Sequence, residues 1–252
     1  MRAIENFRYH AVTKGASWRF TLPMEEAMPT HAAVALPEKG GFVSSITEKY
    51  NFRDIFLFDR AVAFASGSFC EKSNCFDATA SVMIEGLNIL NMVTADRVVA
   101  RIASSHAKDG SEPQINPLGT YFENLRIAGH KVEVDLAVDT FAELDTHTGF
   151  RAASAHKDPA RRDQVLPHVL GTDASGAISC TLVRSISGLG REIRHEGHVI
   201  KIRDFGVLRL AELTMSERKR SMTMLQFQLG STPAGSGDMG GVEGNGSGNF
   251  GN

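Results

Sequence analysis

The chain has 252 residues, of which 42% are hydrophobic and 22% charged, and its net charge at pH 7 is −2. This composition is ordinary for a globular protein, and the near-zero net charge excludes a general attraction to nucleic acid or anionic membranes. No apolar segment approaches the ~18 residues that a membrane-spanning helix needs. We therefore predict neither a nucleic-acid partner nor membrane insertion.

The N-terminal part of the chain predicts two strands, Phe7–Val12 and Trp18–Leu22, joined by a turn that contains Gly15. The preceding residues have no continuous apolar segment, so no secretory signal is predicted. The next clear feature is an aromatic-rich segment with Phe52, Phe56, Phe58, Phe64 and Phe69. Because basic residues do not interleave with these rings at regular spacing, we predict a core segment rather than a surface that stacks bases or sugars.

The stretch Phe76–His106 organises the rest of the chain, because it predicts two strands joined by an apolar corner. In its first half apolar and polar residues alternate with period two, and the same alternation returns from Asp96 to Ile102. A shorter copy follows at Tyr121–Val138, where Lys131–Asp139 is the clearest predicted strand. These copies indicate repeated strand–turn–strand units.

The C-terminal half predicts one helix among strands. Thr140–Ala155 is expected to be an irregular connection, and the helix is expected at 158–166, with Asp158 as its N-cap and Pro159 at the first helical position. Val207–Met215 and Ser221–Leu229 predict a hairpin whose basic turn is solvated.

We therefore predict an all-β fold, an antiparallel sandwich or irregular barrel with one short helix near 158–166. Residues 1–229 are expected to form a single β-rich domain. Residues 230–252 are rich in glycine and serine and are expected to form a flexible tail.

The three cysteines leave their chemistry open. Cys70 and Cys75 flank a turn-like segment, so a hairpin disulfide is geometrically possible, with free thiols and metal binding as the alternatives. A zinc site usually needs CxxC pairs and further ligands, which are absent from the sequence.

Only weak candidates for a metal site exist, namely His195 and His198 with Asp204 nearby. In a strand, positions three apart face opposite sides, and Gly197 favours a turn into a strand. We therefore predict no metal ligands and no cofactor. Asp145 and His147 lie near no nucleophile elbow of the GxSxG type, so no catalytic residues are predicted.

Two segments resemble a known pattern. ATASVMIEGLNILNMVTADRVVARIASSHA and TYFENLRIAGHKVEV, within residues 76–138, are similar to bacterial surface proteins of the choice-of-anchor type, which carry a "GLNLL…VTAD" segment followed by a glycine-containing "F…L.I.G..V" segment. The resemblance implies a β-rich envelope or extracellular protein and no catalytic residues.

Together these observations favour a non-catalytic structural or binding protein of the bacterial cell envelope or surface. Exposed strand edges would let it self-associate, so its expected partner is itself or another protein. The alternative is a hydrolase or lyase acting on a polysaccharide or small ester. It would need the fold to bring together scattered acids and histidines, namely Asp145, His147, Glu196 and His198.

Overall fold

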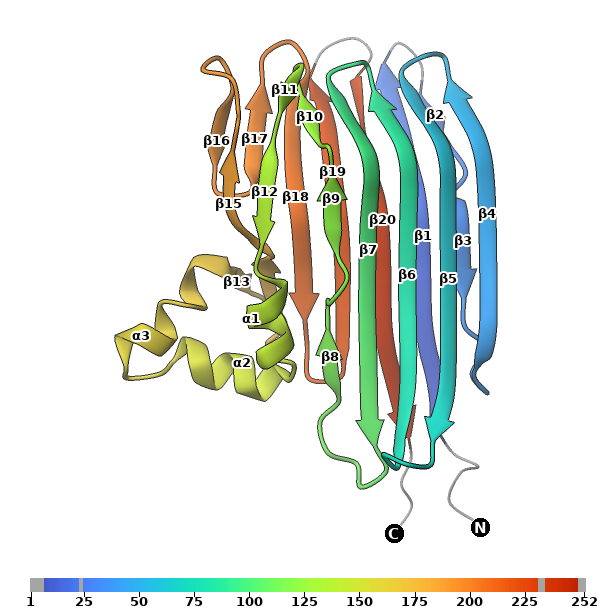
Figure 1. Cartoon of the computed structure of the whole chain (residues 1–252), viewed down its shortest axis with the longest axis vertical. Coiled ribbons are helices and arrows are strands. Elements are labelled where there is room, and N and C mark those ends of the chain that lie inside the picture. The colour runs from blue at the N-terminus through green and yellow to red at the C-terminus, as the bar shows by residue number, and fades with distance from the viewer. Residues whose placement is uncertain (1–6, 23–24, 231–233, 249–252) are drawn as a thin grey trace.

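Two large antiparallel sheets stack face to face in the computed structural model, which describes residues 7–22, 25–230 and 234–248 (Figure 1). In the first sheet the order is β13-β14-β18-β19-β20-β1-β2, while β3 pairs with β1, and the hairpin of β16 and β17 pairs with β18. Its strands are β1 (Phe7–Leu22), β2 (Glu26–Ala27), β3 (His31–Ala35), β13 (Val169–Thr172), β14 (Ile178–Thr181), β16 (Arg194–Glu196), β17 (Val199–Ile202), β18 (Gly206–Met215), β19 (Lys219–Gly230) and β20 (Ala234–Gly248).

The second sheet has the order β11-β10-β7-β6-β5-β4, and β8 and β9 also pair with β7. Its strands are β4 (Gly41–Phe52), β5 (Phe56–Cys70), β6 (Cys75–Ile89), β7 (Val93–Ala107), β8 (Gln114–Asn116), β9 (Tyr121–Glu123), β10 (Arg126–Ile127) and β11 (His130–Lys131). A two-stranded sheet of β12 (Glu133–Leu136) and β15 (Val183–Ser187) completes the strands of the described residues.

The core lies between the long strands, with β1 and β20 packed against β5, β6 and β7. Its two walls differ in side-chain size. The second sheet contributes many alanines, whereas the first contributes large rings such as Trp18 and Phe227. Small residues opposite large ones let two sheets interdigitate without voids. The second sheet also contributes buried rings, and Trp18 lies against one of them, Phe56, with the ring centroids 4.0 Å apart.

The structure confirms the all-β antiparallel sandwich. It also confirms the strand pair predicted from Phe76–His106, as β6 and β7, and the hairpin of β18 and β19. The turn predicted at Gly15 is wrong, because β1 runs through it as one continuous strand. Of the aromatic-rich segment, Phe52, Phe56 and Phe58 belong to the buried core, and Phe69 packs against that core. The prediction is wrong for Phe64, which lies on the opposite face of β5 beside the exposed Phe42. No helix of the described residues is long and apolar enough to cross a membrane.

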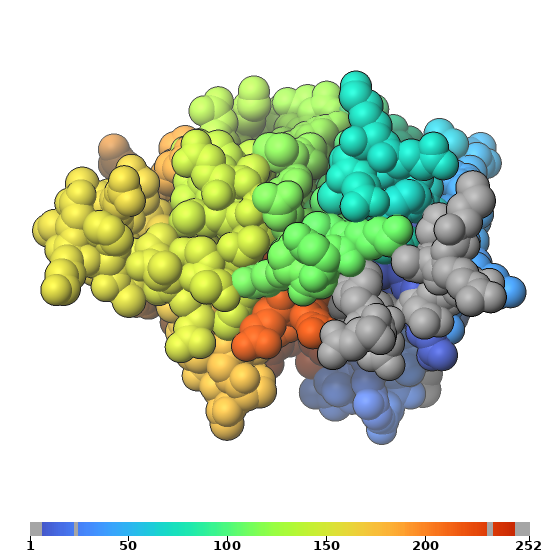
Figure 2. Space-filling view, turned by 90° about the horizontal axis from the view of Figure 1, so that it is seen from below, coloured from blue at the N-terminus to red at the C-terminus, as the bar shows by residue number. Residues whose placement is uncertain are grey.

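The helical segment is larger than the sequence indicated, and it projects from one side of the sandwich (Figure 2). The helix predicted at 158–166 is shorter than expected: α3 comprises only Pro159–Arg162, and a 3-10 turn, η1 (Leu166–His168), follows it. Asp158 caps α3 as expected, and its Oδ1 accepts a hydrogen bond from the Ala160 N–H at 3.0 Å. The prediction of an irregular connection at 140–155 is wrong, because α1 (Val138–Glu143) and α2 (His147–Ser154) lie there. Each helix is anchored by one buried phenylalanine, and the two rings stack with centroids 5.3 Å apart.

The long strand predicted at Lys131–Asp139 is also wrong in extent. Lys131 ends the short strand β11, β12 covers only Glu133–Leu136, and α1 begins at Val138. Alternation continues through Val138, but burying Phe141 against Phe150 requires a helical turn, and this tertiary contact overrides the local pattern.

The flexible tail predicted from residue 230 is wrong for 234–248, which form β20. This strand lies in the first sheet between β1 and β19 and pairs with both along its length. Met239 and Val242 of this strand are buried in the core. Two glycines of this strand occupy positions where a side chain would collide with its neighbours. A Cβ at Gly237 would lie 2.6 Å from the Phe227 ring, and a Cβ at Gly235 would lie 2.5 Å from the Arg19 carbonyl oxygen. Close packing explains the absence of a side chain at these two positions.

Candidate functional site

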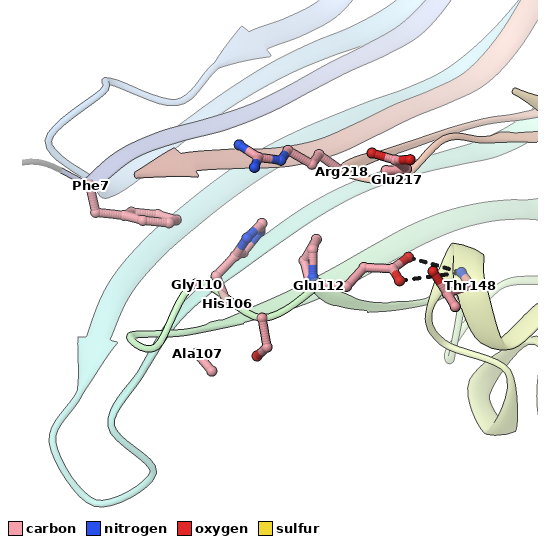
Figure 3. Close-up of a pocket in the computed structure, with 10 residues that line it drawn as sticks. Phe7, His106, Ala107, Gly110, Glu112, Thr148, Glu217 and Arg218 are labelled. Atoms are coloured by element: carbon pink, nitrogen blue, oxygen red, sulfur yellow. Dashed lines mark hydrogen bonds between the residues drawn. The ribbon is translucent and has the colours of Figure 1, made fainter. Parts of the chain in front are cut away.

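A polar pocket of about 240 Å³ opens at one end of the sandwich. It lies between the start of β1, the end of β7 and the loop after it, the β18–β19 turn and the first turn of α2 (Figure 3). Its walls come from both large sheets and from the helical segment. The fold, and no single sequence motif, therefore assembles it.

His106 forms the inner wall of this pocket. It is the last core-facing residue of β7, and only 5% of its surface is exposed. Its ring makes an edge contact with Phe7, with centroids 5.3 Å apart, and its buried Nε2 has no hydrogen-bond partner among the described residues. Burial lowers the pKa of His106 to about 4, with a smaller contribution from Arg218, so the imidazole is neutral at pH 7.

Charged groups surround the imidazole. Arg218 projects from the β18–β19 turn along the side of the pocket opposite β7, and within the described part of the chain it makes no ion pair (Figure 3). Glu112 accepts hydrogen bonds from the backbone N–H groups of His147 and Thr148, the second at 3.1 Å, and so caps α2. Glu217 stands at the exposed rim.

Polar and charged groups line this pocket. They offer a cation, a neutral imidazole, two carboxylates and the Phe7 ring to a small polar molecule. Within the described residues the Nε2 of His106 has no hydroxyl or thiol as a hydrogen-bond partner.

The residues proposed for a hydrolase lie in two separate places. Asp145 and His147 flank the N-cap of α2, and the His147 Nε2 lies 3.1 Å from the Gly176 carbonyl. Glu196 and His198 belong to the β16–β17 hairpin. None of the four lines the pocket at the end of the sandwich.

The weak metal candidates are placed with other partners. His195 is exposed in β16, with its Nδ1 3.5 Å from the Gly197 carbonyl, whereas His198 is buried and bonds Glu212 at 2.8 Å. Asp204 lies in the turn before β18. Across the described ranges, no group of three or more His, Cys, Asp or Glu side chains could hold a metal ion.

Cys70 and Cys75 are free thiols in this structure, as is the buried Cys180. The first two are register partners at the ends of β5 and β6, so they lie directly opposite each other across the hairpin. This placement keeps a disulfide geometrically open, as the spacing in the sequence indicated.

The interpretation of the basic turn 218–220 as solvated is wrong for Arg220. Its side chain is buried, and it donates hydrogen bonds to the carbonyls of Phe141 at 3.3 Å and Leu144 at 2.8 Å at the end of α1. Burial lowers the pKa of Arg220 to about 10. Period two in β19 could have revealed this, because Arg220 shares a face with Met222 and Met224. The same alternation in β7 places His106 on the face of Ile102.

A second feature covers the outer face of the second sheet. Side chains of opposite charge alternate in one row across five strands, in the order Glu48, Arg60, Glu85, Arg97 and Glu123. Arg97 joins Glu85 at 3.1 Å and Glu123 at 3.0 Å, and Arg60 lies 3.9 Å from Glu85. We call this row the charge ladder.

An apolar row runs beside the charge ladder and ends at the edge strand β4. It consists of register partners on the same five strands: Ile46, Val62, Met83, Val99 and Tyr121. Ile46 is 52% exposed, and Phe42 on the same edge is 67% exposed. Large side chains exposed together on a broad face are typical of interaction surfaces.

The comparisons with known proteins give one match. A family model described as "Domain of unknown function (DUF8256)" matches residues 7–166, which include β1, the whole second sheet and α1 to α3. No curated protein and no solved structure matches the chain.

Proposed function

We propose that this chain, which belongs to the DUF8256 family of domains of unknown function, is a non-catalytic structural or binding protein that self-associates through the edge strand β4. Its placement in the bacterial cell envelope or surface rests on the resemblance of residues 76–138 to choice-of-anchor surface proteins. The observation that carries the proposal is the exposed apolar edge formed by Phe42 and Ile46.

Between Gly41 and Thr47 the edge of β4 lacks the usual protection against strand pairing, whereas beyond it Glu48 and Lys49 are charged and Lys49 has a positive φ of 49°. β4 is 12 residues long, and the part from Gly41 to Thr47 contains no charged residue and no proline. On one side β4 pairs with β5, and on its other side it pairs with no strand of the described residues. Natural sheets usually shield such edges with lysines, prolines or short strands, because unpaired N–H and C=O groups template the addition of another strand.

The two faces of β4 restrict how a second copy can pair. Phe42, Ser44 and Ile46 face outward, whereas Thr47 faces β3, where its Oγ1 accepts from the Ala32 N–H at 3.2 Å. In a pairing between β4 of two copies, a register shift of one residue would place outward side chains opposite inward ones. Outward residues of one copy must therefore lie opposite outward residues of the other. An antiparallel pairing centred on Ser44 places Phe42 opposite Ile46 of the second copy, twice by symmetry.

This register also continues the apolar row. On one side Ile46 is followed by Val62 and Met83, and across the new edge it meets the Phe42 ring of the second copy. Phe42 itself lies beside Phe64, with ring centroids 6.2 Å apart. The pairing would form backbone hydrogen bonds and would also bury exposed aromatic and aliphatic side chains. In β-strand addition the hydrogen bonds provide affinity and the side-chain contacts provide specificity.

The test is the mass of the full chain as a function of concentration, by sedimentation equilibrium. We expect a dimer, and Ile46→Lys should weaken the association at least tenfold by placing a charge in the pairing. Leu118→Lys is the matched control, because Leu118 is 49% exposed in a turn away from β4 and its substitution should leave the dimer intact. A monomer at concentrations up to about 1 mM, or equal effects of the two variants, would refute self-association through β4.

A further inference from the structure

We propose that the pocket at the end of the sandwich is a binding site for a small monocarboxylate, whose anionic group is held by Arg218 and the ring N–H of His106. This inference goes beyond self-association, and it uses no residue of β4.

The buried imidazole is the first observation. A buried polar atom without a hydrogen-bond partner is unfavourable and uncommon in folded proteins, and a partner from outside the chain explains its retention. The Nε2 of His106 is such an atom, and its ring lines the pocket. In the tautomer protonated at Nε2, the ring donates one hydrogen bond to an acceptor in the pocket.

The second observation is the state of Arg218. Several arginines on the sheets are paired with carboxylates, as Arg97 is with Glu85 and Arg184 with Asp139. Arg218 has no such partner in the described ranges, and its side chain extends along the pocket wall that faces His106 (Figure 3). A guanidinium presents a planar fork of donors that matches the two oxygens of a carboxylate.

The size and charge of the pocket restrict the class of ligand further. A volume of about 240 Å³ equals roughly eight water volumes of ~30 Å³, so the ligand is small. Phe7 and Pro113 offer apolar contact for a short hydrocarbon tail. Glu112 and Glu217 also line the site, and they would repel a second negative group. A monoanion such as propionate therefore fits the pocket better than a phosphate dianion.

The experiment is an NMR titration of the full chain with sodium propionate, following the ring resonances of His106, with sodium chloride at equal ionic strength as the reference. Inorganic phosphate is titrated in a parallel arm. We expect a saturable shift with propionate and a weaker or no response to phosphate. Arg218→Gln should weaken propionate binding at least tenfold, because it removes a charged hydrogen-bond donor.

Two further variants separate binding from folding. Arg203→Gln makes the same change in an exposed turn between β17 and β18, which Figure 1 places at the opposite end of the sandwich, and it should leave binding unchanged. His106→Phe keeps an aromatic ring beside Phe7 but removes the nitrogen, so it should fold and lose the response to propionate, followed through the backbone amides of the pocket.

The proposal is overturned by any one of three results. These are the absence of a saturable shift with propionate, unchanged binding in Arg218→Gln, and tighter binding of phosphate than of propionate.

Discussion

Replacing Gly237 by alanine is expected to destabilise the protein although it adds only one methyl group. A Cβ at this position would lie 2.6 Å from two carbons of the Phe227 ring and 2.7 Å from the Cβ of Trp18. Both neighbours are core residues of the strands on either side, so neither can move without disturbing other contacts. Overpacking of this kind costs about 1–3 kcal/mol.

The unfolded state offsets part of this cost. Alanine restricts the unfolded chain more than glycine does, which stabilises the folded state by about 0.4–1 kcal/mol. We therefore expect a net loss of about 1–2 kcal/mol in the free energy of unfolding for Gly237→Ala. Gly241→Ala is the matched control on the same strand, because its Cβ would meet nothing closer than 3.5 Å. Its effect should lie within about 0.5 kcal/mol of zero.

Urea denaturation followed by tryptophan fluorescence is the suitable assay. Trp18 is the single tryptophan of the chain, and it lies beside Gly237. If the two alanine variants unfold at the same urea concentration as the wild type, β20 is not packed between β1 and β19, and the reasoning is refuted. A flexible C-terminal segment would give that result.

Three other perturbations have defined outcomes. Arg220→Met should lower the free energy of unfolding by about 2–4 kcal/mol, because it removes the donor to the buried Phe141 carbonyl and to the partly buried Leu144 carbonyl. Arg218→Met should change it by less than about 0.5 kcal/mol, and equal values for the two variants in urea denaturation would contradict the buried role of Arg220. Lowering the pH from 6.5 to 4 should destabilise the protein, because the pKa of His106 is about 4 in the folded state and ~6.5 in the unfolded state, so the unfolded state binds the proton first. This histidine accounts for a loss of at most about 3 kcal/mol in the free energy of unfolding. If His106→Phe has the same pH dependence of stability as the wild type, the assignment to His106 is wrong. Oxidation should join Cys70 to Cys75 in a disulfide and raise the free energy of unfolding by about 2 kcal/mol. If mass spectrometry shows that both thiols can still be alkylated after oxidation, the two residues do not form a disulfide.

Local pattern was sufficient where one strand face is buried and the other is exposed. In β6 the alternation of Ala78, Ala80, Val82 and Ile84 with polar residues predicts both the strand and its core face, and the structure has that strand and that face. The cap of α3 was equally readable, since a hydrogen bond from the Ala160 N–H to Asp158 involves residues close in sequence.

The candidate sites could not be predicted from local sequence patterns. The pocket unites Phe7, His106 and Arg218, which are distant along the chain and carry no shared motif. Alternation indicates that His106 faces the core. Only the arrangement of the two sheets shows that a cavity lies beside it, lined by Arg218, which has no ion pair among the described residues. The charge ladder likewise depends on the register of five strands. In the sequence, each of its charged residues by itself predicts only a solvated surface position.

By itself the sequence determined the class of the fold and the core faces of the long strands, because period-two burial is a local property. Tertiary structure alone decided the role of β20. Its glycines carry no hydrophobic pattern and resemble a flexible segment. Only the Phe227 ring and the Trp18 Cβ on the adjacent strands show why a side chain is excluded at Gly237. The physical reason is that a strand can be specified by the space its neighbours leave, and that space does not exist until the sheet has formed.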